Sequence, residues 1–373
     1  MSEAPSLGGR VADRRRRPVE PPVYAALDLG TNNCRLLIAT PSPRGFRVVE
    51  AYSRIIRLGE GMSQTGELSE PAMARAMAAL KICAEKIRRR RAVRVRSIAT
   101  QACRGARNGA AFVEQVAIET GLKLQIISTQ EEARLSVAGC QTLLDQNSDA
   151  ALVMDVGGGS TELSWVDLRG PGLGGDDKGR HGATPRLPPW RIPIHAWLSI
   201  PVGMVTLAER YPEGERATHA WFRAMVDDVK VRVAAFDRAD AMREMFTLGN
   251  VHLVGTSGAL TSLAGLHLDL PRYDRNIVDG MWLTRGDCEA AVARLLTISH
   301  AERAAQACIG ADRADLVLAG AAILQAVQEV WPCERVRVAD RGLREGLLHS
   351  LMADRGRRKR GGHRRNSFRG EGV

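Results

Sequence analysis

The stretch Asp28-Leu-Gly-Thr-Asn-Asn-Cys-Arg-Leu36 has a second, related copy further along the chain, Asp155-Val-Gly-Gly-Gly-Ser-Thr-Glu-Leu163. The copies lie at a constant offset of 127 residues, from 28 to 155, and agree in the aspartate, the next apolar residue, the glycine and the final leucine. Internal similarity of this kind is typical of two copies of one supersecondary unit. We therefore expect two related lobes that face each other across a cleft, with a ligand bound between them.

The patterns around the two turns predict elements in the same order in both halves. In the first half, three short apolar or alternating runs are followed by helix, strand, helix, strand and helix, at residues 23–28, 34–40, 46–52, 69–91, 93–100, 110–120, 124–128 and 131–144. The second half starts again with strands at 151–155, 162–167 and 191–201, followed by a helix, a strand at 251–254 and another helix. Three more helical segments between about 284 and 330, a strand at 335–339 and a helix at 341–352 complete it. The sequence thus predicts an α/β fold of two βββα-type lobes, each a mixed sheet flanked by helices, hinged near residues 145–150.

Most of the net charge of +11 lies at the two ends of the chain. Residues 1–22 hold five arginines against three acids, and residues 353–373 hold seven arginines and Lys359 against two acids. Such segments cannot fold alone, so we expect disordered basic ends, either simply solvated or holding a polyanion weakly without sequence readout. The run Arg88–Arg91 has a structural explanation, because it ends a predicted helix where cations offset the helix dipole.

The composition argues against several classes of protein. No run approaches the roughly 18 apolar residues of a membrane span, and no apolar signal-peptide region follows Arg14–Arg17. The seven cysteines are scattered without CxxC spacing, which speaks against a zinc site or a disulfide framework. We expect a cytoplasmic protein with domains at 23–147 and 148–340, whose thiols are small buried side chains.

Both glycine turns carry the groups that bind phosphate. Each aspartate ends an apolar strand, and the glycines after it let backbone N–H groups converge on an anion. Since the carboxylates would repel a phosphate, a cation must lie between them, and Mg²⁺ suits oxygen ligands and phosphate substrates. An ordinary hairpin has no need of three glycines. We therefore predict two phosphate-binding turns, made by Asp28, Gly30, Thr31, Asn32, Gly157, Gly158, Gly159, Ser160 and Thr161.

Two further features have more than one interpretation. A third turn, Gly255-Thr256-Ser257-Gly258, follows a strand and opens a helix, which suits either anion binding or tight strand-to-helix packing. Glu131 and Glu132 follow Ser128 at the start of a predicted helix. From the residues alone these glutamates are a capping pair, although a carboxylate there is also able to face the cleft.

The chain resembles the exopolyphosphatase and guanosine pentaphosphate phosphohydrolase (Ppx/GppA) family, in a short two-domain form. This family lies within the actin-like superfamily that also contains hexokinases and acetate kinase. The resemblance runs from about Tyr24 to Met352. Its motifs, in the family's order, are Asp28-Leu-Gly-Thr-Asn-Asn-Cys-Arg-Leu-Leu, Ala99-Thr-Gln-Ala-Cys-Arg104, Glu131-Glu132-Ala-Arg134, Asp155-Val-Gly-Gly-Gly-Ser-Thr-Glu162, Gly255-Thr-Ser-Gly, Arg313-Ala-Asp315 and Gly342-Leu-Arg-Glu-Gly346.

The resemblance implies two actin-like (ribonuclease H-like) βββαβα domains, with the helix at 341–352 packed back on the first. It implies that Glu132 activates the attacking water, leaving capping to Glu131, and that Asp155 and Glu162 are linked to magnesium. It further implies that Arg104 contacts the phosphate chain and that Asp28, Thr31 and Asn32 form the first phosphate turn. With this support, Gly255, Thr256 and Ser257 become a third phosphate turn.

Some positions depart from the family's pattern. Asn33 stands where Ser or Thr is usual, Thr31 replaces Ser, and Gln101 stands where Ser is common. These polar exchanges bear on donor geometry more than on chemistry. Longer members carry an additional helical C-terminal region, which this chain is not expected to have, and homodimers are common among relatives.

We expect a hydrolase that releases the terminal phosphate of inorganic polyphosphate or the 5′ phosphate of guanosine pentaphosphate, with Mg²⁺. A kinase or ATPase of the same superfamily would also use paired phosphate turns, but no sugar- or acyl-binding motif is recognisable. A non-catalytic alarmone or polyphosphate sensor is the third possibility. The presence of Asp28, Glu132, Asp155 and Glu162 speaks against it.

Overall fold

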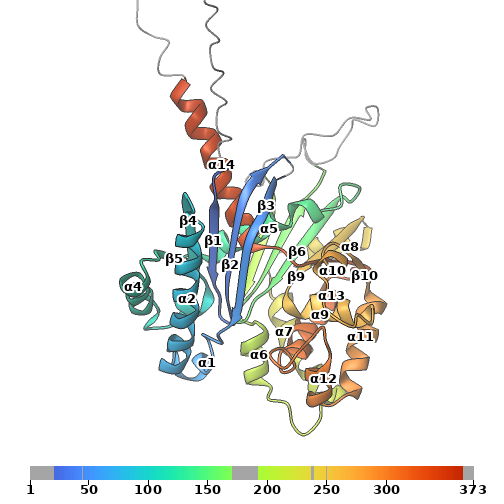
Figure 1. The fold of residues 1–373 in the computed structure, drawn as a ribbon. Helices are drawn as coiled ribbons and strands as arrows, with labels where there is room; N and C mark the ends of the chain where they lie inside the picture. Colours follow the sequence, from blue (N-terminus) through green and yellow to red (C-terminus); the bar gives the residue numbers. More distant parts are fainter. Residues whose placement is uncertain (1–20, 44, 170–191, 237–238, 249, 364–373) are drawn as a thin grey trace, which may run out of the picture.

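The computed structural model describes residues 21–363 apart from 44, 170–191, 237–238 and 249. Almost all of the predicted basic arm at 1–22, and the end of the predicted basic tail, lie outside the described residues. A stretch rich in glycine and proline, residues 170–189, also lies outside the described residues. The described residues form two lobes, shown in blue to cyan and in green to orange in Figure 1.

The first lobe is built on a five-stranded sheet in the order β3-β2-β1-β4-β5. β1, β2 and β3 form an antiparallel meander, and β1, β4 and β5 run parallel. Its elements are β1 (Tyr24–Leu29), β2 (Asn33–Ser42), β3 (Gly45–Ile55), α1 (Met62–Thr65), α2 (Glu70–Arg89), β4 (Arg94–Ala99), α3 (Gln101–Gly105), α4 (Gly109–Thr120), β5 (Leu124–Ile126), α5 (Thr129–Cys140) and η1 (Gln141–Leu143).

The second lobe is built on a six-stranded sheet in the order β10-β11-β9-β6-β7-β8. Its elements are β6 (Ala150–Val156), β7 (Thr161–Asp167), β8 (Ile194–Ile200), α6 (Met204–Arg210), α7 (His219–Ala234), α8 (Ala239–Leu248), β9 (Val251–Thr256), α9 (Gly258–His267), α10 (Arg275–Val278), β10 (Trp282–Thr284), α11 (Arg285–Thr297), α12 (His300–Ala305), α13 (Val317–Val330), β11 (Arg335–Ala339) and α14 (Leu343–His363).

The two sheets confirm the predicted duplication. β8-β7-β6-β9-β11 repeats the order and the strand directions of β3-β2-β1-β4-β5. The second sheet adds β10, an antiparallel edge strand that the sequence did not predict. Its three residues are too few to show an alternating pattern. The actin-like fold class is therefore correct, and the duplicated turns lie at equivalent places in the two sheets.

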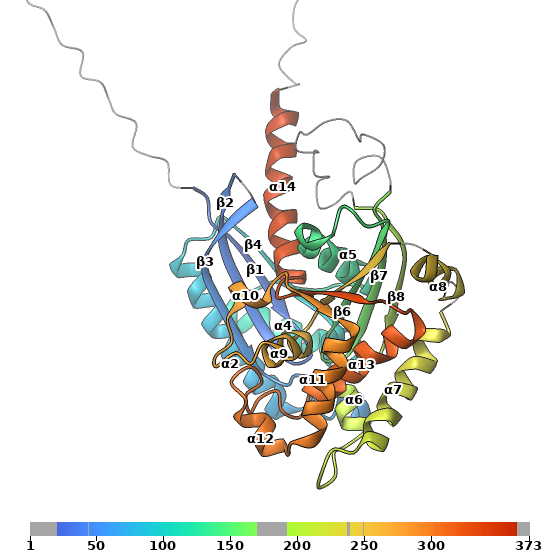
Figure 2. The same ribbon diagram turned by 90° about the vertical axis from the view of Figure 1, so that its right-hand side faces the viewer.

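Two helices cross between the lobes. α14 follows the second sheet along the chain but packs on the first, where Leu347, Leu348 and Leu351 join the apolar cluster of Tyr24 and Leu37. α5 belongs to the first half of the sequence but covers the second sheet, where Val137 and Cys140 pack on strands β6, β7 and β9. Figure 2 shows both helices side by side between the sheets. The predicted docking of the last helix on the first lobe is confirmed, whereas the predicted division at 147 separates α5 from the sheet that it covers.

The last helix is longer than predicted. We placed its end at residue 352, before a disordered tail, but α14 continues to His363. Residues 353–363 are therefore helical in the structure. Arginine and lysine are good helix formers, so their density there did not exclude a helix.

The arginine run lies at the end of α2, as predicted, and part of it binds a strand of the first sheet. Ser69 caps the helix by accepting a hydrogen bond from the Ala72 N–H. At the other end, Lys86, Arg89 and Arg90 all donate to Glu50 on β3. These bonds, that from Lys86 foremost, lower the pKa of Glu50 to about 2. The run thus joins the last turn of α2 to the edge of the first sheet.

The structure also bears on the predictions about membrane spans and cysteines. Within the described part of the chain, no helix combines the length and apolarity needed to cross a bilayer. All seven cysteines are free and buried, in agreement with small apolar side chains. The thiols of Cys34 and Cys83 share a hydrogen bond, with 3.9 Å between their sulfur atoms.

Close backbone contact between α5 and α14 leads to a stability prediction. A Cβ on Gly346 would lie 2.0 Å from the carbonyl oxygen of Leu135, and one on Gly139 would lie 1.8 Å from that of Gly342. We expect Gly346→Ala to destabilise the protein by at least the roughly 1–3 kcal/mol of overpacked sites, because a backbone cannot yield as a side chain does. Thermal unfolding measures the change. The control is Gly214→Ala, which adds a methyl group in open space; equal melting temperatures for the two variants would contradict the packing argument.

Candidate functional site

The two glycine turns face each other and are closed in the same way. In the first turn the Gly30 N–H donates to the Asn33 carbonyl at 2.9 Å, and in the second the Gly157 N–H donates to the Ser160 carbonyl at 2.9 Å. A Cβ on Gly158 would lie 3.1 Å from the Asn32 backbone nitrogen. The glycines therefore allow the two turns to approach within van der Waals contact.

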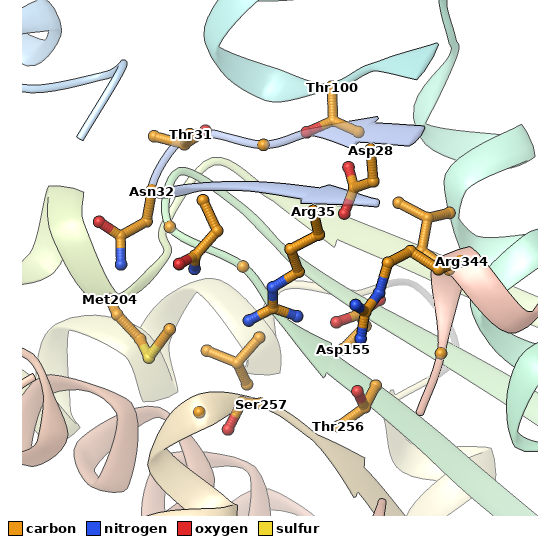
Figure 3. A pocket seen from close by; sticks show the side chains of 18 of the residues that line it. Asp28, Thr31, Asn32, Arg35, Thr100, Asp155, Met204, Thr256, Ser257 and Arg344 are labelled. Carbon is orange, nitrogen blue, oxygen red and sulfur yellow. The ribbon is translucent and has the colours of Figure 1, made fainter. Parts of the chain in front are cut away.

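A cavity of about 290 Å³ lies between these turns and takes its walls from both lobes. It contains all but three of the predicted site residues. Those on its wall are Asp28, Gly30, Thr31, Asn32, Glu132, Asp155, Gly157, Gly158, Gly159, Ser160, Glu162, Thr256 and Ser257. Figure 3 shows Asp28 and Asp155 in this shared space, as the sequence predicted.

The two aspartates are held in the same register. Asp28 on β1 lies opposite Arg35 on β2, and Asp155 on β6 lies opposite Glu162 on β7. Burial raises the pKa of Asp28 to about 6, against the opposing charges of Arg35 and Arg344. Burial also raises the pKa of Asp155. One oxygen of Asp28, Oδ1, is buried without any hydrogen-bond partner in the described residues.

Glu132 stands in the first turn of α5, with its carboxylate at the cavity. Ser128 caps this helix by accepting from the Glu131 N–H at 3.2 Å. The Glu132 side chain is buried, and its Oε2 accepts a hydrogen bond of 3.0 Å from Arg104 Nη1. Burial raises the pKa of Glu132 well above its usual value, and the charge of Glu162 adds to this, while Arg104 opposes it.

Glu131 has a different role from the capping predicted for it. Its carboxylate accepts hydrogen bonds from Arg96 and Arg134. The cap is supplied by Ser128 alone, since these two arginines hold the Glu131 side chain away from the helix terminus. The capping prediction was wrong, although the two glutamates do differ in their surroundings.

Glu162 lines the same cavity as Glu132 and is also buried. Burial raises its pKa to about 7, and Asp155 adds to the shift. The Ser199 hydroxyl on β8 donates to Glu162 Oε1 at 3.0 Å. Each carboxylate in this group makes ionisation of the next more costly, because like charges in a buried site repel.

Three predicted phosphate contacts do not lie on the cavity wall. Arg104 donates hydrogen bonds to the Ile127 carbonyl, to Gln101 and to Glu132, so its guanidinium binds other groups of the protein. Thr161 is fully buried and donates to the Val202 carbonyl at 2.7 Å. Gly255 serves packing, because a Cβ there would lie 2.1 Å from the Leu260 side chain of α9.

The rest of the third turn reaches the cavity. Ser257 is the N-cap of α9, and its Oγ accepts a hydrogen bond of 3.0 Å from the Leu260 N–H. Thr256 stands beside it at the end of β9. Gly255 therefore serves packing, whereas Thr256 and Ser257 face the cavity (Figure 3). Anion binding by Thr256 and Ser257 stays a prediction.

Several arginines on the cavity wall are not among the predicted site residues. Arg35 and Arg344 point into the space beside Asp28 and Asp155 (Figure 3). Neither forms a hydrogen bond or an ion pair within the described part of the chain. Burial lowers the pKa of Arg344, while Glu345 and Asp28 oppose the shift. Both arginines lie inside motifs quoted above, but the motifs do not show where the side chains point. The register of β1 and β2 places Arg35 opposite Asp28, and the packing of α14 on the first sheet brings Arg344 to the cavity.

The donor set fits a magnesium ion shared with a substrate. Asp28 keeps an unpartnered buried oxygen, and the charge of Asp155 raises the cost of ionising Glu162, which a bound cation would relieve. No three histidine, cysteine, aspartate or glutamate side chains among the described residues are grouped as a ready metal cage. Mg²⁺ usually takes one or two carboxylates together with waters and substrate phosphates, so a site completed by substrate agrees with both observations.

Comparison with known proteins points to one family. The model described as the Ppx/GppA phosphatase family matches residues 37–355. A guanosine-5′-triphosphate,3′-diphosphate pyrophosphatase of Photobacterium profundum is 30% identical over 339 residues, which are 91% of this chain and 61% of that protein. Exopolyphosphatase 2 of Mycobacterium tuberculosis is 28% identical over 340 residues, 88% of this chain and 98% of that protein.

A solved structure agrees with this grouping. The crystal structure of the Ppx/GppA family member of Aquifex aeolicus superposes with a TM-score of 0.69 at 25% identity, covering 90% of this chain and 98% of that one. The chain thus matches nearly the whole length of two relatives and spans less than two thirds of the Photobacterium protein.

The buried aspartate of the first turn leads to a prediction on pH and stability. The folded protein keeps a proton on Asp28 up to about pH 6, whereas the unfolded chain releases it near 3.8. Stability therefore falls as the pH rises through this window, by about 3 kcal/mol for this group. Asp28→Asn removes the titration, so its stability relative to the wild type should rise between about pH 4 and 7 and then level off. Chemical denaturation in EDTA measures it.

The matched control is Asp167→Asn on β7. The hydrogen bond from Arg169 lowers the pKa of Asp167, so its contribution is present above the unfolded pKa and is lost as the pH falls. The Asp167 variant should therefore be less stable than the wild type at about pH 8, with the difference closing in acid. A pH-independent difference for Asp28→Asn would contradict the assigned burial effect.

Proposed function

The chain belongs to the Ppx/GppA phosphatase family, and from that premise we propose a phosphohydrolase that removes the terminal phosphate of inorganic polyphosphate or the 5′ phosphate of guanosine pentaphosphate. The observation that carries the proposal is a single cavity in which glycine turns from both lobes meet a buried glutamate. The names of the relatives support this substrate class. The glycine turns suit any chain of phosphates.

The proposed binding of the phosphates uses the groups on the cavity wall. Backbone N–H groups of the glycine turns and the side chains of Thr31, Asn32 and Ser160 supply donors. Arg35 and Arg344 supply positive charge without a competing partner in the described residues. A planar guanidinium binds phosphate oxygens in pairs, so these two side chains suit the phosphates next to the one that is removed.

The proposed chemical step is attack of water on the terminal phosphorus, in line with the oxygen that leaves. Glu132 accepts the proton from the water as the new P–O bond forms and the bond to the bridging oxygen breaks. Its raised pKa makes the ionised carboxylate a stronger base than an ordinary glutamate. Arg104 is a positioning residue in this scheme, because it holds Oε2 of Glu132, whose side chain lines the cavity.

Asp155 and Glu162 are the proposed magnesium ligands. The ion, when bound, would neutralise charge on the phosphate oxygens. The protein's own contribution is to hold these two carboxylates in adjacent register positions on β6 and β7. Ser199 fixes the direction of Glu162 through its hydrogen bond.

Glu132→Gln tests the base. The amide keeps the shape and the Arg104 contact but cannot take a proton, so we expect turnover to fall by roughly 10²–10⁴-fold with the fold intact. Phosphate release should be measured with polyphosphate, guanosine pentaphosphate and ATP side by side, with no added acceptor. Glu131→Gln is the control, since its side chain faces Arg96 and Arg134. Wild-type rates for Glu132→Gln would remove it from the mechanism.

Asp155→Asn tests the metal assignment. We expect EDTA to abolish phosphate release and MgCl₂ to restore it. Because a neutral amide is a weaker ligand for Mg²⁺ than a carboxylate, Asp155→Asn should raise the Mg²⁺ concentration for half-maximal activity by about tenfold or more. The exposed Glu114→Gln exchange should leave that concentration unchanged. An Asp155 variant with the wild-type Mg²⁺ response would exclude this residue as a ligand.

A further inference from the structure

Two side chains of the second lobe hold one loop of the first. Glu209 on α6 accepts hydrogen bonds from the Gly61 N–H at 2.9 Å and from the Ser63 hydroxyl at 2.7 Å. Asp315, just before α13, pairs with Arg57 at 3.0 Å. Figure 1 shows α1, where the loop ends, beside α6 of the other lobe. These contacts join the lobes at the segment 56–63, which we call the strap.

The strap also supports the first phosphate turn. The backbone N–H groups of Ile56 and Arg57 both donate to the Asn32 carbonyl, at 2.8 and 3.1 Å. The Gly59 N–H donates to the Thr31 carbonyl at 3.0 Å. Thr31 and Asn32 therefore receive their backbone support from the same segment that the second lobe holds.

The backbone of the strap has an unusual shape. Arg57 has a φ of 46°, in the left-handed region that residues other than glycine seldom enter. A Cβ on Gly59 would lie 2.3 Å from the Thr31 side chain. Such conformations persist only where surrounding contacts fix them, and they concentrate at functional sites. The Nε of Arg75, which donates to the Ile56 carbonyl at 2.9 Å, is one of those contacts.

The other end of this connection supports the second phosphate turn. α6, which carries Glu209, begins with the N–H groups of Met204 and Val205 donating to the carbonyls of Gly157 and Gly158, at 2.9 and 2.8 Å. A continuous series of contacts thus runs from the first turn through the strap, Glu209 and α6 to the second turn. A cavity of about 350 Å³ lies beside it, with walls from both lobes, so it exists only when the lobes are together.

We propose that the strap, Glu209 and Asp315 form a clamp that holds the two phosphate turns at their working separation. Glu209 is a positioning residue, because it touches neither the main cavity nor the groups that react. Without the clamp the lobes populate an open arrangement in which the phosphate donors are too far apart. The apparent affinity for the substrate is then the affinity of the closed form multiplied by the fraction of molecules that are closed. The chemical step in the closed complex is unchanged. The kinetic part of this inference rests on the proposed phosphohydrolase activity.

Glu209→Ala, Ser63→Ala and the double variant test the clamp. We expect KM for inorganic tripolyphosphate to rise about 3–10-fold for Glu209→Ala with kcat within about twofold of the wild type. Ser63→Ala should give a smaller rise, because Gly61 still donates to Glu209. The double variant should resemble Glu209→Ala alone, since residues that share an interaction are not additive. Glu215→Ala removes an exposed acid from the loop after α6 and should match the wild type.

Small-angle X-ray scattering supplies a readout that does not need catalysis. In a Glu132→Gln background, which slows turnover, the Glu209→Ala protein should have a larger radius of gyration without ligand than Glu132→Gln alone. It should return to the Glu132→Gln value with saturating tripolyphosphate and MgCl₂. An unchanged radius and KM would overturn the clamp. A loss of kcat at constant KM, in step with a lower melting temperature, would overturn it as well, by showing a purely structural role. If the wild type hydrolyses no substrate, the proposed function fails, and scattering still decides the clamp.

Discussion

Contact of backbone with backbone between the lobes is the constraint on which the site depends. Gly158 lies against the backbone of Asn32, and Gly139 and Gly346 let α5 and α14 touch through their main chains. A methyl group on Gly139 or Gly346 would lie within 2.0 Å of a carbonyl oxygen and would force α5 and α14 apart, and one on Gly158 would press against Asn32 at 3.1 Å. The aspartates at the ends of β1 and β6 share one cavity only because this contact is available. The glycines therefore have a second function besides exposing N–H donors, which is to set the distance between the lobes.

The two copies of the duplicated unit carry side chains of opposite charge at one equivalent position. The register that places Arg35 opposite Asp28 in the first lobe places Glu162 opposite Asp155 in the second. One wall of the cavity therefore balances its acid with a cation, while the other adds a second acid. An anion is favoured at the first wall and a cation at the second. Two copies of one structure are thus suited to bind a phosphate chain and a metal ion in the same cleft.

The sequence predicts the turns, the cleft and both aspartates, because glycine runs and strand-ending acids act locally. It does not show which side chain of a turn faces the ligand. Ser160 lines the cavity while its neighbour Thr161 bonds to the Val202 carbonyl, and only the strand register separates them. The family resemblance implies that Arg104 contacts the phosphate chain. In the structure its guanidinium donates hydrogen bonds to three acceptors of the protein itself. Arg344 reaches the site because α14 returns to the first sheet, a contact between distant parts of the chain.

On the proposed function, burial sets how strong a base Glu132 is. Burial and the neighbouring acids raise the pKa of Glu132 well above its usual value, so its ionised form takes a proton from water more readily than an exposed glutamate would. A cation held by Asp155 and Glu162 would offset the repulsion that these two acids exert on Glu132. Arg104 opposes the same shift and donates a hydrogen bond to Glu132 Oε2. An exposed glutamate would have neither the burial nor this arginine, which gives a physical reason for placing the catalytic carboxylate inside the protein rather than at the mouth of the cleft.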